Sequence, residues 1–242
     1  MGYGYAAPAD MAFESRMRGE IIAAARAMNV GGTDFSTFEN SRCNPRYWTR
    51  TGGGGFELNA NVTPSAAIND IFVNGQLYAF ECAMAMVMIL YKATINMIGE
   101  AAFNRYFTGL YLWDWNYDSN LKLITTFNRN ELQPGDVVYF KNPDHDPAKP
   151  EWQGENAIML SRDSYYGHGL GIKNATQMIV SLNRERVPGS RTSAYLADEG
   201  LHPDFAYIAS LGNARMGPPV SAKVNAKTAI YSRIGTKSYI IR

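Results

Sequence analysis

The sequence predicts an α+β protein, with helices first along the chain and a mostly antiparallel set of strands after them. Up to residue 107, most of the chain carries apolar residues at helical spacing, and from residue 110 short β-prone runs take over. Helices and strands that are segregated in this way favour an α+β architecture over one in which they alternate around a parallel sheet.

Four helices are predicted in the first part of the chain. The first covers 10–29, where apolar residues fall on one face. The second begins after Thr63, a favourable N-cap, with Pro64 at the first helical position. The third, 78–98, is apolar nearly all round in its first half, which indicates a helix buried on most sides. The fourth covers 100–107.

The strands are predicted from short β-prone runs between turn residues. Within 46–62, four glycines separate two such runs and indicate a hairpin, without the Gly-Lys-Ser/Thr and following helix of a phosphate-binding loop. One helix, 175–186, interrupts the later strands. Those strands are predicted at 110–113, 136–140, 156–160, 165–172 and 192–196.

The distribution of charge divides the chain into two parts. The net charge is +1, but residues 205–242 contain six basic residues and no acidic one. We expect one domain over 1–212 and a basic C-terminal extension over 213–242, in which the runs 226–235 and 236–242 can form a small, loosely paired hairpin. The alternative is that the extension contacts an acidic surface, or supplies amine donors for self-cross-linking, namely Lys223, Lys227 or Lys237.

Composition excludes several classes of protein. With 46% hydrophobic and 12% aromatic residues the chain is not disordered, and 23 basic against 22 acidic residues provide no field that would attract nucleic acid. Two cysteines cannot form a disulfide framework, and their spacing relative to the three histidines is not that of a zinc site. The most apolar stretch, 82–91, is well short of the roughly 20 residues that cross a bilayer, and the N-terminal residues do not resemble a secretion signal.

Cys82 is the first candidate for chemistry. It stands in the first turn of the predicted buried helix, where free N–H groups and the helix dipole favour the thiolate, the nucleophilic form of cysteine. The alternative is a cysteine that only packs, because free cysteine is among the most buried residue types. Cys43 lies in a loop-like segment and has no such advantage.

A nucleophilic cysteine needs a group that takes and returns a proton. His168 lies between glycines in a predicted strand, which marks either a close approach to a ligand or a satisfied core histidine. Glu81 is either such a group or an ordinary acid at a helix start. Glu155 opens an apolar strand, and can act as a base only if burial raises its pKa; otherwise it is a strand-end charge in water. Spacing alone leaves these alternatives open.

Six segments in order carry a resemblance to a known family. They are NGQLYAFECA (74–83), LYLWDWNYD (110–118), PGDVVYFKNPD-x-D-P (134–147), EWQGENAIML (151–160), YYGHGLGI (165–172) and SAYL (193–196). Together they resemble the bacterial spore-coat protein-glutamine gamma-glutamyltransferase family, over about four-fifths of the chain. The resemblance implies a papain-like α+β fold of the endopeptidase-amidase superfamily, with a cysteine-bearing core helix against an antiparallel sheet.

The resemblance also implies an activity and its residues. The family members are calcium-independent transamidases that need no cofactor or metal. Their nucleophile is the cysteine of Phe-Glu-Cys, here Cys82, and its partner is the glutamate of Gly-Glu-Asn, here Glu155. Glu81 is implied as a partly redundant helper, and His168 as a neighbouring polar group. An apolar passage to the thiol is implied by the tryptophans of two motifs and a phenylalanine, here Trp115, Trp152 and Phe35.

The implied reaction joins a glutamine side chain of one protein to a lysine side chain of another through a cysteine thioester. Two alternatives remain open at this stage. One is a protein-glutamine deamidase or cysteine peptidase-amidase, including an effector that uses the same fold against a target cell. The other is a structural coat protein with a relic site. The family implies a spore-coat setting, but the longer N-terminal lead of the family and the basic tail of this chain leave the compartment undetermined.

Overall fold

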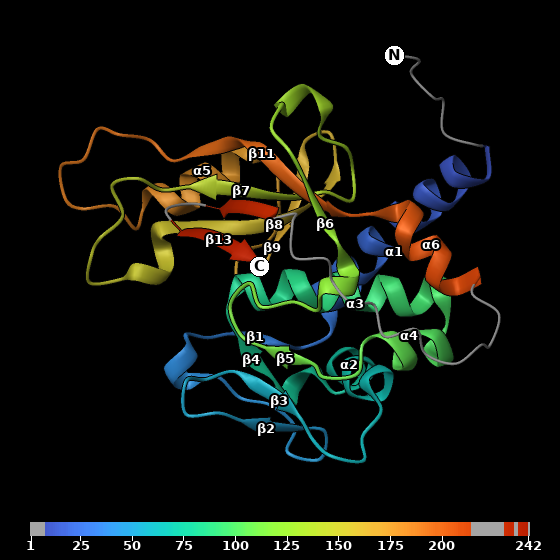
Figure 1. Cartoon of the computed structure of the whole chain (residues 1–242). Helices are drawn as coiled ribbons and strands as arrows, with labels where there is room; N and C mark the ends of the chain where they lie inside the picture. Colours follow the sequence, from blue (N-terminus) through green and yellow to red (C-terminus); the bar gives the residue numbers. More distant parts are fainter. Residues whose placement is uncertain (1–7, 214–229, 235–236, 242) are drawn as a thin grey trace.

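The computed structural model describes residues 8–213, 230–234 and 237–241, and its architecture is α+β (Figure 1). The helices are α1 (Pro8–Val30), α2 (Pro64–Val73), α3 (Cys82–Ile98), α4 (Glu100–Tyr106), α5 (Ala175–Asn183) and α6 (Phe205–Asn213). The strands of the N-terminal half are β1 (Asp34–Phe35), β2 (Trp48–Arg50), β3 (Phe56–Leu58), β4 (Ala79–Phe80) and β5 (Tyr111–Leu112). Those that follow are β6 (Leu123–Thr126), β7 (Val137–Lys141), β8 (Gly154–Ser161), β9 (Ser164–Gly167), β10 (Gly171–Lys173), β11 (Tyr195–Pro203), β12 (Ile230–Ile234) and β13 (Lys237–Ile241).

The main sheet has six strands in the order β10-β9-β8-β7-β11-β6, and all its pairs are antiparallel. Helices cover both of its faces. On one face α3 packs against β8 and is itself flanked by α1 and α6, and on the other α5 closes a smaller core against β10 and β11. The three-stranded sheet β2-β3-β5 lies on the far side of α3, in the lower part of Figure 1.

Helix α3 is the centre of the larger core. Its side chains are buried from Cys82 to Tyr91 and again through most of the next turn, and Gly99 ends the helix with a positive φ of 81°. Burial on all sides is what the apolar sequence of this segment predicts. The helix begins at Cys82 rather than at the predicted Tyr78, because residues 78–80 are extended: β4 pairs in parallel with β1, and Phe80 accepts a hydrogen bond from the N–H of Ser36.

The segment predicted as one strand, 165–172, is two strands. Strands β9 and β10 pair with each other, and His168 lies in the turn between them rather than inside a strand. Gly169 and Gly171 have φ angles of +94° and +75°, which residues with a side chain rarely adopt, so the chain reverses there. Three further elements, β1, β6 and α6, were not predicted, and the predicted strand 192–196 overlaps the longer β11 only at Tyr195 and Leu196.

The C-terminal extension pairs as predicted in its last part, where β12 and β13 form a two-stranded antiparallel sheet. Lys223 and Lys227, two of the lysines considered as amine donors, lie outside the described residues, and the side chain of Lys237 is not described either. In the described part of the chain no helix is long and apolar enough to cross a membrane.

Candidate active site

Cys82 is the first residue of α3, separated from β4 by Glu81 alone, and only 8% of its surface is exposed. Glu81 is the N-cap of the helix: its two carboxylate oxygens accept hydrogen bonds from the backbone N–H groups of Ala83 and Met84, each at 2.7 Å. A carboxylate that caps a helix in this way fixes the direction in which the chain enters the helix. Glu81 therefore fixes the position of the neighbouring Cys82 at the N-terminal end of α3.

The sulfur of Cys82 faces β8. The side-chain amide of Asn156 donates to Cys82 Sγ at 3.3 Å, and the backbone N–H of Asn156 donates to it as well. Burial nevertheless raises the pKa of the thiol well above its ordinary value, and the charges of Glu155 and Glu81 raise it further. This is the opposite of the thiolate expected from the helix start, because burial and the two carboxylates outweigh the helix start, whose N–H groups at Ala83 and Met84 are already bonded to Glu81. The resting sulfur is a thiol that needs a base.

Glu81 has the acidity of such a base. Burial raises its pKa to about 7, against the lowering effect of the hydrogen bonds from Ala83 and Met84. The neighbouring Cys82 thiol also lowers the pKa of this carboxyl group. A carboxyl group that titrates near neutral pH can both take a proton and return it. Glu81 is therefore more than a helix cap.

Glu155, on β8, is the second carboxylate beside the thiol. It is 3% exposed, and its Oε1 has no hydrogen-bond partner among the described residues. Burial, and then the charge of Glu81, raise its pKa well above its ordinary value, while a hydrogen bond from the backbone N–H of His168 lowers it. The carboxylate lies over Gly167, where a Cβ atom would come within 2.7 Å of Oε1. A buried carboxyl group with a raised pKa and an unused oxygen binds a proton more strongly than an ordinary glutamate does.

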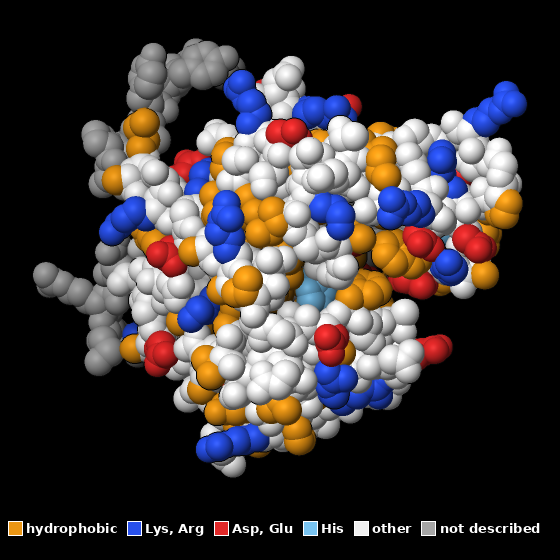
Figure 2. Space-filling model, turned by 180° about the vertical axis from the view of Figure 1, so that it is seen from behind, with side chains coloured by type: hydrophobic (Ala, Val, Ile, Leu, Met, Phe, Trp, Pro, Cys, Tyr) orange, Lys and Arg blue, Asp and Glu red, His pale blue; other side chains and the backbone are white. Residues whose placement is uncertain are grey.

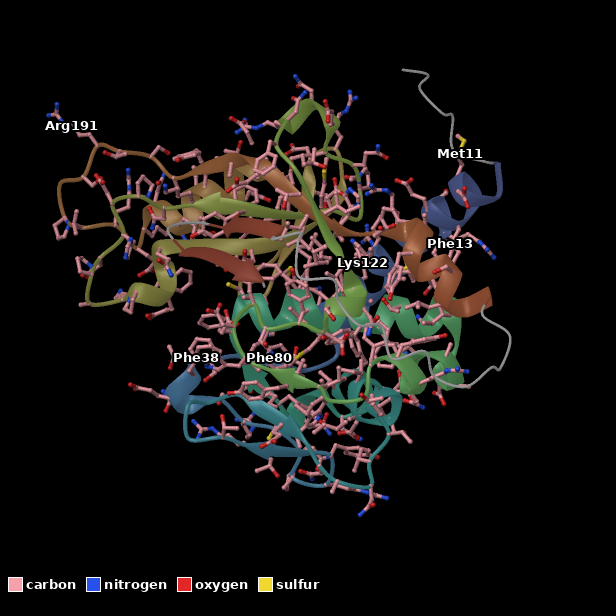
Figure 3. All side chains as sticks on the ribbon, in the orientation of Figure 1. Met11, Phe13, Phe38, Phe80, Lys122 and Arg191 are labelled. Carbon is pink, nitrogen blue, oxygen red and sulfur yellow. The ribbon has the colours of Figure 1, made fainter. Side chains whose placement is uncertain are left out.

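His168 serves the architecture of the site. The backbone oxygen of Asp34 can only accept, so His168 Nε2 donates to it at 3.1 Å, and Nδ1 accepts from the hydroxyl of Tyr166 at 3.0 Å. The ring stacks on Phe80 with centroids 4.5 Å apart, at the end of β4 where Figure 3 labels that residue. Burial lowers the pKa of His168 to about 4, so the ring is neutral at neutral pH. With both nitrogens bonded, this side chain positions β9 against β1 and β4.

The buried neutral His168 makes stability depend on pH. Its pKa is about 4 in the folded chain and near 6.5 when unfolded, so its contribution is fully present above about pH 6.5 and is lost as the pH falls toward 4. The loss amounts to roughly 3 kcal/mol. We expect denaturant unfolding of a His168→Gln variant to show a smaller decrease between pH 6.5 and 4 than the wild type. Parallel curves for the two proteins would contradict a buried neutral ring.

The predicted aromatic residues are only partly brought together. The rings of Phe35 and Trp152 have centroids 6.2 Å apart, and Phe35 lies 6.3 Å from the His168 ring. Figure 2 shows a hollow between the upper and lower parts of the molecule, with a histidine in it and hydrophobic side chains beside it. Trp115 is 8% exposed and belongs to the larger core, and among the described ring contacts none joins it to Phe35 or Trp152.

Two residues of the site were not singled out from the sequence, Asn156 and Tyr166. Asn156 stands next to Glu155 in an otherwise apolar strand, and a buried amide in that position was the available signal. Tyr166 gave no signal in the sequence, because its hydroxyl bonds to His168 two residues later and only the turn after β9 brings these two side chains together. Among the described residues, no group of three or more His, Cys, Asp or Glu side chains is placed to hold a metal ion.

A buried thiol beside two carboxylates with raised pKa values, on a helix that packs against an antiparallel sheet, is an arrangement that can carry out acyl transfer, and the class of protein that it indicates is an acyltransferase. Comparison with known proteins makes the assignment narrower. The chain belongs to the protein-glutamine gamma-glutamyltransferase family, whose profile matches residues 1–212.

Individual relatives agree with this assignment. A protein-glutamine gamma-glutamyltransferase of Bacillus cereus (strain B4264) is 49% identical over 196 residues, which are 81% of this chain and 71% of the relative. The corresponding protein of Bacillus mycoides (strain KBAB4) is 48% identical with the same coverage. The solved transglutaminase from Geobacillus stearothermophilus, without its C-terminal extension, superposes with a TM-score of 0.81 and 44% identity over 87% of this chain and 100% of that one.

These findings confirm the predicted family, the α+β fold with Cys82 in a buried helix, and an acyltransferase activity. The protein is a protein-glutamine gamma-glutamyltransferase by family.

Proposed function

We propose that this protein is a calcium-independent transamidase that links glutamine and lysine side chains of proteins through a thioester on Cys82. The observation that carries the proposal is the position of the buried Cys82 sulfur at the start of α3, where the charges of Glu155 and Glu81 both act on it and where Oε1 of Glu155 has no hydrogen-bond partner among the described residues. A thiol with a raised pKa reacts at neutral pH only if a neighbouring base removes its proton during attack. Both carboxylates are placed to do so.

In the first half-reaction the sulfur attacks the carboxamide carbon of a glutamine side chain. The thiol proton passes to a carboxylate, for which we propose Glu155, and from there to the leaving nitrogen. The carbon–nitrogen bond breaks, ammonia departs, and the acyl group remains on Cys82 as a thioester. The hydrogen bonds from Asn156 to the sulfur stabilise the thiolate as it forms and as it leaves again.

In the second half-reaction a lysine ε-amine attacks the thioester carbon. The amine gives up a proton to Glu155 or Glu81, the carbon–sulfur bond breaks, and the proton returns to the sulfur. The products are an isopeptide bond and the free thiol. Water in place of the amine would give glutamate, that is, deamidation. The burial of the thiol and of Glu155 supports the amine, because a dry site keeps competing water away.

The aromatic cluster supports a neutral acyl donor. Phe35 and Trp152 lie on the side of the site where His168, uncharged at neutral pH, contributes no positive charge. A carboxamide on a short methylene stem suits such walls, because its stem is apolar and its polar end reaches the sulfur. We therefore propose that the glutamine side chain enters past Phe35 and Trp152.

The test is the incorporation of a fluorescent primary amine into a glutamine-bearing protein in the presence of a calcium chelator, with the released ammonia measured in parallel. We expect the chelator to leave amine incorporation unchanged. We also expect the amount of incorporated amine to equal most of the ammonia released. Ammonia release without incorporation would identify a deamidase instead. Incorporation that stops in the chelator and resumes with added calcium would contradict calcium independence.

A further inference from the structure

Asn142 is a buried polar residue that the mechanism above does not use. It directly follows β7, and none of its surface is exposed. Its Oδ1 has no hydrogen-bond partner among the described residues, and burying an amide oxygen in this state is unfavourable. The bonds of the amide nitrogen show what an asparagine contributes at this position.

The amide nitrogen of Asn142 joins two segments of the chain. Its Nδ2 donates to the backbone oxygen of Trp152 and to that of Leu182, each at 3.0 Å. Trp152 belongs to the 3-10 helix η5 (Pro150–Gln153), and Leu182 is a fully buried residue in the last turn of α5. Both partners are carbonyl oxygens, which only accept, so the nitrogen must face them. Asn142 therefore ties the segment that carries Trp152 to α5.

Trp152 lies just outside the paired part of the main sheet. The pairing of β7 with β8 ends at Lys141 and Gly154. Glu155 is therefore held by the sheet itself, whereas Trp152 precedes the first paired residue of β8. The backbone N–H of Asn142 donates to the backbone oxygen of the residue after Trp152 at 2.9 Å, and the side chain bonds the next one back. Asn142 thus holds the chain where strand pairing stops.

The ring of Trp152 depends on this backbone for its position. It is half-buried, packs at the edge of the smaller core, and lies opposite Phe35 in the aromatic cluster. A 3-10 helix of four residues has few hydrogen bonds of its own, and their geometry is poorer than in an α-helix. The place of such a segment is therefore determined by bonds from outside it.

We propose that Asn142 is a positioning residue for the glutamine substrate: by holding the backbone of Trp152 it keeps the ring opposite Phe35 and so sets the affinity for the glutamine side chain. This inference rests on the transamidase function and on the entry of glutamine proposed above. Asn142 acts through Trp152 and not through Glu155, which strand pairing holds. Binding of the glutamine should therefore respond to Asn142, and the chemical step should not.

The variant Asn142→Asp replaces the donor by an oxygen without changing the size of the side chain. Near pH 8 we expect the KM for a glutamine peptide to rise about 10-fold, because two buried hydrogen bonds are lost. The kcat and the KM for an alkylamine should stay within about 2-fold of the wild type, as for a loss of ground-state binding. A general loss of structure would instead lower kcat and leave the KM unchanged. The control Asn130→Asp, the same change at an exposed side chain, should behave as the wild type.

The pH dependence of the same variant tests whether the donor is what matters. A buried carboxyl group that faces two carbonyl oxygens has a raised pKa, and once protonated it can donate one hydrogen bond. The ratio of the glutamine-peptide KM of Asn142→Asp to that of the wild type should therefore decrease from about pH 8 to about pH 6. A ratio that stays constant would contradict a role for the donor.

The variant Trp152→Ala tests whether Asn142 acts through the ring. We expect it to raise the KM for the glutamine peptide at least as much as Asn142→Asp does, and the double variant should show no further rise. An unchanged KM in either single variant, or a further 10-fold rise in the double variant, would overturn the inference. Asn142→Ser, whose hydroxyl keeps one donor, should show a smaller rise and provides the measurement if Asn142→Asp does not fold. A wild type without amine incorporation would contradict the transamidase itself, whereas an active wild type with an unchanged KM in Asn142→Asp would contradict only the positioning.

Discussion

Replacing Cys82 by alanine is expected to abolish amine incorporation and ammonia release together, by at least ~10⁴-fold, because both half-reactions pass through its sulfur. Intact-mass measurement with a glutamine peptide and no amine should show an acyl adduct on the wild type and none on Cys82→Ala. The variant should remain folded, since alanine fits the space that the thiol vacates at the first position of α3 and Glu81 continues to cap the helix.

Cys43→Ala is the matched control for this experiment. Cys43 is the other cysteine of the chain; its thiol points to the backbone oxygen of Trp48 at 3.7 Å, and burial raises its pKa to about 11. Because this thiol bonds a backbone oxygen rather than a carboxylate, we expect full activity in Cys43→Ala. Equal activity in Cys82→Ala and wild type would show that Cys82 is not the nucleophile. A loss of activity in Cys43→Ala alone would identify Cys43 as the nucleophile instead.

The local chemistry of the sequence predicts the helices of this fold well. Helix α2 begins at Pro64 after Thr63, and α3 is buried on all sides, both as their residues indicate. The start of α3 is displaced from Tyr78 to Cys82 for a reason that acts over a distance in sequence. Residues 78–80 are drawn into pairing with β1 and its flanking residues, more than forty positions earlier, and nothing in the local pattern reports that partner.

The pKa values of the site residues could not be predicted from the local sequence for the same reason, because they depend on residues that are distant along the chain. Position at a helix start suggested a stabilised thiolate at Cys82, but the outcome depends on Glu155, which the fold brings from β8, and on Glu81, which uses the helix N–H groups itself. Likewise, the sequence could not tell whether the nitrogens of His168 face the thiol. They bond Tyr166 and the backbone of Asp34, 134 residues away in the chain.

The two carboxylates were proposed from resemblance, and the structure supplies physical grounds for dividing the work between them. Glu155→Gln is expected to lower the rate of transamidation at least ~10²-fold, the usual scale of general acid–base assistance. Glu81→Gln should cost less, because Glu155 with its unbonded oxygen remains. The double variant should lose ~10⁴-fold or more, since no carboxylate is then left to take the thiol proton.

Chemical reactivity of the thiol should change in the opposite direction. The charges of Glu155 and Glu81 both raise the pKa of Cys82, so removing either makes the thiolate easier to form. Iodoacetamide should therefore alkylate Cys82 faster in Glu155→Gln than in the wild type at the same pH, although turnover is slower. A general loss of structure would also speed alkylation, because it exposes the buried thiol, so the stability of the variant is what distinguishes loss of structure from the loss of a base.

Stability provides the third measurement on the same variants. The pKa of Glu81 is raised to about 7, so the folded chain holds a proton that the unfolded chain has released, and stability falls as the pH rises from about 4.5 to 7. Glu155 has a pKa raised in the same direction, so Glu155→Gln should unfold at a higher temperature than the wild type near pH 8. A variant that is more stable, more readily alkylated and ~10²-fold slower would show that the buried charge is kept for catalysis. A Glu155→Gln protein with normal turnover would instead leave Glu81 as the only base.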